Sequence, residues 1–255
     1  MPITSRLFSA ALMLPAVLCA QAAFADANYA VNQNGAVLSG KNAEIDRNYD
    51  ILAAHVHAAG NIVTFHMTTN GAAGESIPDA VGTLGGAEVQ SYVWPTSLDP
   101  EGIGFEGGKG VLALVATSHP DFDDTPLFDE DGDGDLTNDG AKWHSHWIVL
   151  APNDACGDGA LAVQDIPKGA EPNMPATWPG LPIYIDSPGY SPVFDGPEIT
   201  IKVPFSGQLT AAALNYDGGT AALRVNQNVH APLLCVFDVF DIASGDLSLP
   251  GQLKR

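Results

Sequence analysis

The sequence predicts an all-β protein, a single-domain antiparallel β-sandwich of about a dozen short strands, with a β-barrel as the second choice. The 255 residues include 27 glycines and 19 prolines, and only 16% are charged, a composition typical of short strands joined by turns. Runs of alternating apolar and polar residues recur between these turns. No segment keeps a helical period over about 12 residues.

The strands are predicted from β-branched and aromatic runs bounded by turn residues. The predicted ranges are 29–38, 49–57, 62–69, 88–94, 111–118, 142–151, 160–166, 183–185, 198–203, 210–216, 220–225 and 233–241. Ala59-Gly60-Asn61 and Asp217-Gly218-Gly219 favour hairpins between the strands that flank them. The proline-rich stretch 167–192 keeps apolar and aromatic residues, so we expect an ordered loop there.

The N-terminus predicts a cleaved signal peptide. Arg6 is its only charge, and the apolar run that follows is too short to span a bilayer. Ala23 and Ala25 form the small-residue pattern of a cleavage site. We therefore expect residues 1–25 to be removed and residues 26–255 to fold as one β-rich domain. Its location would be periplasmic or secreted, without membrane insertion after cleavage.

The charge balance narrows the possible partners. With 10 Lys+Arg against 30 Asp+Glu, the formal net charge is −20, which disfavours nucleic acid and anionic membranes. The hydrophobic fraction of 45% excludes disorder through lack of a core. Metal ions are the expected partners, and a protein partner is left open.

Two cysteines remain after the predicted cleavage, Cys156 and Cys235. An even number in an oxidising compartment favours one disulfide, which in the chain-entropy account contributes roughly 4 kcal/mol. Two buried free thiols are the alternative.

The acidic segment 129–139 is the most specific motif. It holds five Asp and one Glu within eleven residues. Hard cations such as Ca²⁺ take 6–8 oxygen ligands. It resembles the D-x-D-x-D-G calcium loops of EF-hand, dockerin and thrombospondin type-3 proteins, with Gly140 where an EF-hand has a bidentate Glu. The resemblance implies calcium ligands at Asp129, Asp131, Asp133, Asp135, Thr137 and Asp139. A solvated acidic loop is the alternative.

Histidines recur at alternate positions of predicted strands. His55 and His57 share one strand face, and pairing His57 with Ile62 would place His66 on that face, while Leu52 and its alternate neighbours face the core. Imidazole suits copper and zinc. The H-V-H triplet resembles the copper half-site of copper–zinc superoxide dismutases.

A second H-x-H strand holds His144 and His146, again on one face. If the two strands are neighbours, one transition-metal site follows. Its candidate ligands are His55, His57, His66, His144 and His146. Ordinary surface histidines are the alternative.

One further segment supplies a nitrogen and three carboxylates directly after the strand 111–118. These possible accessory ligands are His119, Asp121, Asp123 and Asp124. A simple turn, punctuated by prolines, is the alternative.

Three functions follow from these features. The first is an exported copper- or zinc-binding protein with a structural calcium loop, serving metal binding, delivery or resistance. The second is a metalloenzyme at the same histidines with an Asp general base. The third is a calcium-stabilised module that recognises a carbohydrate or protein through aromatic residues. Those aromatics are Trp94, Trp178, Tyr184 and Tyr190.

Overall fold

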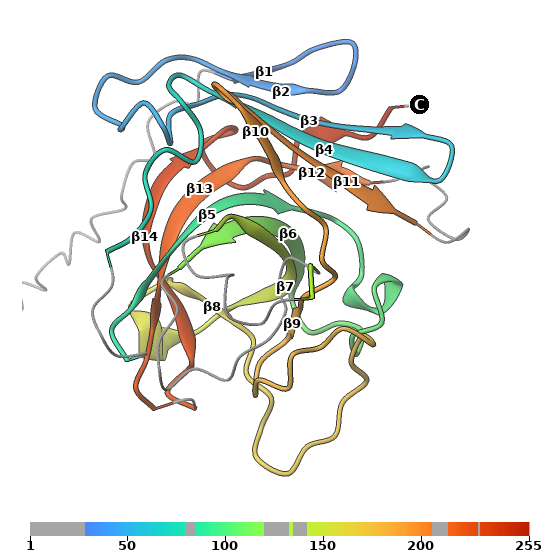
Figure 1. Ribbon diagram of the computed structural model, residues 1–255, viewed down its shortest axis with the longest axis vertical. Helices are drawn as coiled ribbons and strands as arrows, with labels where there is room; N and C mark the ends of the chain where they lie inside the picture. Colours follow the sequence, from blue (N-terminus) through green and yellow to red (C-terminus); the bar gives the residue numbers. More distant parts are fainter. Residues whose placement is uncertain are drawn as a thin grey trace, which may run out of the picture.

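The computed structural model describes residues 29–79, 85–119, 133–134, 142–205, 214–228 and 230–254. Over these ranges the chain is all-β, with antiparallel sheets in two layers, which confirms the predicted fold class. In Figure 1 an open sheet lies across the top, above a second sheet that curls round on itself. The fold therefore combines both predicted architectures, a sandwich in which one layer is a barrel.

The open layer is a six-stranded sheet in the order β1-β2-β3-β4-β11-β10, hereafter the outer sheet. Its strands are β1 (Tyr29–Val31), β2 (Val37–Ser39), β3 (Ile51–Ala59), β4 (Ile62–Thr69), β10 (Val193–Asp195) and β11 (Glu198–Pro204). A two-residue loop joins β3 to β4, with Gly60 at a φ of +63° that glycine adopts readily. Ala59 therefore pairs with Ile62, and His57 faces Thr64, which corrects the predicted register by two residues.

The second layer is a barrel in the order β6-β5-β13-β14-β8-β7, closed by pairing between β6 and β7. Its strands are β5 (Glu88–Pro95), β6 (Val111–Ser118), β7 (His144–Pro152), β8 (Leu161–Val163), β13 (Gly219–Val225) and β14 (Leu234–Ile242). The short strand β9 (Ile185–Asp186) also pairs with β7. Closure gives each barrel strand an inner and an outer face.

Short elements complete the described chain. β12 (Asn215–Tyr216) pairs with β15 (Gly251–Gln252), and two 3₁₀ turns, η1 and η2, cover Pro100–Gly102 and Asp154–Cys156. No helix in these ranges is long and apolar enough to cross a bilayer.

Alternation along the barrel strands produces two hydrophobic cores. One lies between the layers and contains Phe65, Trp94 and Trp147. The other fills the barrel and contains Val115 and Ile148. Because both faces of β6 are buried, its sequence is an almost unbroken apolar run.

The predicted disulfide is present between Cys156 and Cys235, with the Cα atoms 5.5 Å apart. Cys235 is also the residue through which β14 pairs with β8, opposite Ala162. The crosslink therefore lies at the barrel seam that has the fewest paired residues.

Two local predictions are wrong. The range 29–38 is interrupted by a turn between β1 and β2. The residues Asp217-Gly218 do not form a hairpin, because β12 pairs with β15 whereas β13 pairs with β5 and β14. Asp217 is instead fully buried and accepts backbone hydrogen bonds from Gly218 and Ser244.

Candidate metal centre

Three histidines meet where β6 ends and β7 begins. One ring nitrogen each of His119, His144 and His146 lies within 4.8 Å of the others. His119 directly follows β6, and Thr117 at the end of that strand lies opposite His144 on β7. The ring centroids are 4.9 Å apart for His119 and His144, and 4.8 Å apart for His144 and His146. The antiparallel pairing of β6 with β7 thus assembles the group from two chain segments.

The two β7 histidines point into the barrel. His146 lies opposite Val115 and two residues before Ile148, and both of these belong to the barrel core. His144 is 0% exposed and His146 is 4% exposed. Water is therefore largely excluded from their rings.

Backbone carbonyl groups orient both buried rings. Nδ1 of His144 lies 3.1 Å from the carbonyl oxygen of Lys142, and Nδ1 of His146 lies 3.3 Å from that of Asp186. A carbonyl oxygen only accepts, so Nδ1 carries the proton in each ring, and in the neutral ring the lone pair is then on Nε2. The Ser187 hydroxyl lies a further 3.1 Å from Nδ1 of His146. This arrangement is typical of histidines that bind metal through Nε2.

The carbonyl group behind His146 is itself held firmly. Asp186 pairs with Trp147 across β9 and β7, and its side chain accepts a hydrogen bond of 2.7 Å from the Thr177 hydroxyl. Asp186 is 3% exposed, and this burial raises the pKa of its carboxyl group. Its side chain contacts Thr177, while its backbone carbonyl oxygen contacts Nδ1 of His146.

The remaining predicted histidine ligands lie elsewhere. His55, His57 and His66 occupy the face of the outer sheet that points away from the barrel, because the alternate residues of β3 and β4 face the core. His55 lies directly opposite His66, and the rings of His55 and His57 are stacked with centroids 5.3 Å apart. Burial and the neighbouring His57 and His66 lower the pKa of His55.

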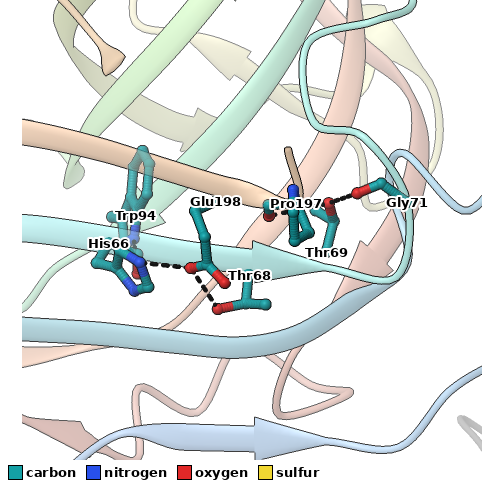
Figure 2. A network of polar contacts seen from close by, with 7 residues as sticks. All are labelled: His66, Thr68, Thr69, Gly71, Trp94, Pro197 and Glu198. Carbon is teal, nitrogen blue, oxygen red and sulfur yellow. Dashed lines mark hydrogen bonds and ion pairs between the residues drawn. The ribbon is translucent and has the colours of Figure 1, made fainter. Parts of the chain in front are cut away.

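Figure 2 shows the polar contacts of His66. Its Nε2 atom lies 2.6 Å from a carboxylate oxygen of Glu198 on β11, which also accepts a hydrogen bond of 2.9 Å from Thr68. On the other side of the strand, the indole of Trp94 donates to the His66 carbonyl oxygen at 3.2 Å. Trp94 belongs to the core between the layers, so the His66 ring and that core lie on opposite faces of β4.

The two H-x-H strands are therefore not neighbours, since β3 belongs to the outer sheet and β7 to the barrel. This corrects the expected five-histidine site. The structure brings together His144, His146 and His119, and it separates them from His55, His57 and His66.

Most of the predicted oxygen ligands lie outside the described residues. These are Asp121, Asp123, Asp124, Asp129, Asp131, Asp135, Thr137 and Asp139. Asp133 is described, is exposed, and has a carboxylate oxygen 3.5 Å from Nζ of Lys142. The calcium loop remains a prediction from the sequence.

Two of the four aromatic residues of the third hypothesis are internal. Trp94 is 0% exposed and Tyr184 is 2% exposed, while Trp178 and Tyr190 are half-buried against the cores. Trp94 and Tyr184 are thus unavailable for surface recognition.

No protein-family model, curated protein or solved structure matches the chain.

Proposed function

We propose that the protein binds a single copper or zinc ion inside its barrel through His119, His144 and His146, in the service of metal binding, delivery or resistance. The convergence of three imidazoles within 4.8 Å carries this proposal. The carbonyl contacts of the two buried rings support it, since they direct Nε2 toward a common ion.

The chemistry of the ligands favours borderline transition metals. Neutral imidazole nitrogen suits Zn²⁺ and Cu²⁺, whereas Ca²⁺ and Mg²⁺ require oxygen. A metal–nitrogen distance of about 2.0–2.1 Å brings tetrahedral ligand atoms to about 3.4 Å from one another. Modest rotation of the rings would draw the group together around an ion.

The disulfide supports an oxidising compartment, because such crosslinks are rare in the cytosol. We propose export through the predicted signal peptide to the periplasm or the medium. We further propose that calcium binds at Asp129–Asp139 and stabilises the protein.

A metalloenzyme at the same ion is the second candidate. Among the described residues the group offers three candidate ligands, and a three-ligand metal with an open position is the arrangement of catalytic zinc sites. In this version Asp121, Asp123 or Asp124 would act as general base. Turnover with the metal-loaded protein distinguishes an enzyme from a carrier.

Metal content of natively exported, untagged protein tests the main proposal. One equivalent of copper or zinc is expected in the wild type and in a His55→Ala/His57→Ala control. His144→Ala and His146→Ala should each abolish it. Binding should also raise the free energy of unfolding, by about 2.7 kcal/mol when the free metal is 100 times its dissociation constant.

Circular dichroism would establish that the variants remain folded. A folded His144→Ala/His146→Ala protein that retained its metal would overturn the proposal, as would metal lost from the His55→Ala/His57→Ala control alone.

A further inference from the structure

Two buried hydroxyl groups stand in the same row of the barrel wall as His144. Ser91 on β5 lies directly opposite Thr117 on β6, which lies directly opposite His144 on β7. Residues directly opposite in antiparallel strands point to the same face, with Cβ atoms about 4.5–5.5 Å apart. Val93 is two residues after Ser91, and Val115 is two residues before Thr117, so they lie on the same face. Both belong to the barrel core, which identifies this face as the barrel interior.

Neither hydroxyl group has a hydrogen-bond partner among the described residues. Ser91 is 0% exposed and Thr117 is 5% exposed, and both hydroxyl oxygens are buried. Leaving a buried polar group unsatisfied costs about 1–3 kcal/mol. Both groups belong to the inward-facing row that leads to His144, so a ligand at the metal centre is a candidate partner for them.

The charge of the proposed centre indicates what that partner is. A divalent ion held by three neutral imidazoles keeps both of its positive charges. The surrounding barrel core is apolar, and an uncompensated charge in such a medium is costly. An anionic fourth ligand would offset this charge and accept hydrogen bonds from both hydroxyl groups.

Burial sets the size of the ligand. Ser91 and His144 are 0% exposed and Thr117 is 5% exposed, so a ligand among them has a few atoms only. The cavity of about 60 Å³ further along the barrel is lined by none of these three residues.

We propose that the metal centre takes a small monoanion, such as hydroxide, azide or formate, as its fourth ligand, with Thr117 and Ser91 as positioning residues that donate hydrogen bonds to it. This inference depends on the proposed metal site. Thr117 is the nearer residue in the row and is expected to contribute more.

Azide and Co²⁺ provide the test, because the visible spectrum of Co²⁺ reports both coordination by histidine and exchange of the fourth ligand. The protein without metal is first titrated with Co²⁺, and the loaded protein is then titrated with azide. Saturable spectral change is expected in the wild type. Loss of one hydroxyl in Thr117→Val should weaken azide binding roughly tenfold, and Ser91→Ala should weaken it by a smaller factor.

Ser118→Ala is the matched control. Ser118 is also buried without a hydrogen-bond partner among the described residues, but alternation places it on the outer face of β6, toward the core between the layers. Its azide affinity should equal that of the wild type.

The outcomes separate the two proposals. Failure of the wild type to take up Co²⁺ would overturn the metal site and this inference together. A loaded wild type that ignores azide, or a Thr117→Val protein that binds azide as tightly as Ser118→Ala does, would overturn only the anion site.

Discussion

Asp217 and Ser244 are joined by two hydrogen bonds in the fully buried interior, one from the backbone N–H and one from the hydroxyl group of Ser244. The same carboxylate accepts a third hydrogen bond, of 2.8 Å, from the N–H of Gly218. It thereby satisfies donors just beyond the end of the pairing between β13 and β14, where Gly219 lies opposite Ile242.

Replacing this carboxylate should be among the most destabilising single changes outside the apolar cores. Asp217→Ala leaves the buried N–H groups of Gly218 and Ser244 without an acceptor, whereas the Ser244 hydroxyl group still has Asp246. We expect a loss of about 2–4 kcal/mol in the free energy of unfolding, measured with urea. Asp195→Ala, on the exposed edge strand β10, should change it by less than about 0.5 kcal/mol. Comparable effects of the two substitutions would refute this role for Asp217.

Removal of the disulfide tests the barrel seam. Cys156→Ala/Cys235→Ala frees a crosslink between residues separated by 79 positions, and the chain-entropy relation predicts a loss of about 4 kcal/mol. Urea unfolding of the double variant against the oxidised wild type measures it. An unchanged midpoint would mean that the single pair between β14 and β8 holds the seam unaided.

His55 should make the protein sensitive to mild acid. Burial, His57 and His66 lower its pKa in the folded state, so the unfolded state binds the proton more readily. The stabilising contribution is therefore complete above the unfolded pKa of about 6.5, and it is lost as the pH falls from that value through the lower folded pKa. His55→Gln should reduce the fall in unfolding free energy between pH 7.5 and pH 5. An identical pH profile in the variant would exclude His55 as the cause.

The hydroxyl group of Thr117 should destabilise the metal-free protein. Thr117→Val keeps the shape of the side chain and removes a buried group that has no partner in the described chain, so we expect a gain of about 1 kcal/mol. Thermal unfolding of the metal-free protein measures this gain. A destabilised variant would show that the hydroxyl group already has a partner in the metal-free state.

Calcium should stabilise the chain through its acidic segment. On the strength of the resemblance to calcium loops, millimolar Ca²⁺ should raise the melting temperature of the wild type, and chelation should reverse the effect. Asp129→Asn/Asp131→Asn should abolish the response, whereas Asp195→Asn should preserve it. An equal response of both variants would assign the calcium effect to another part of the molecule.

Local patterns were sufficient for much of the fold. The Gly60-Asn61 turn forms the hairpin of β3 and β4, and alternation places His55 and His66 on one face despite the different register. Alternation fails at the start of β3, where a register shift between Ile51 and Ala53 turns Ile51 into the core, a position expected for Leu52.

The candidate site was only partly predictable because it depends on long-range pairing. The H-x-H pattern identifies His144 and His146, but nothing in either segment specifies that β7 joins a barrel while β3 joins an open sheet. His119 was grouped with Asp121, Asp123 and Asp124 as an accessory ligand. Its position directly after β6 becomes informative only once β6 is known to pair with β7.

The end of the described chain hydrogen bonds to its beginning. The N–H of Gln252 donates to the carbonyl oxygen of Gly35, to which the Tyr216 hydroxyl group also donates, and the N–H of Ala58 donates to the carbonyl oxygen of Lys254. A ribosome makes Gly35 long before it makes Lys254. These contacts of the outer sheet therefore form only after residues 252–254 have been synthesised. Removal of residues 252–254 should accordingly loosen the first strands of the outer sheet, although these strands lie about two hundred positions earlier in the sequence.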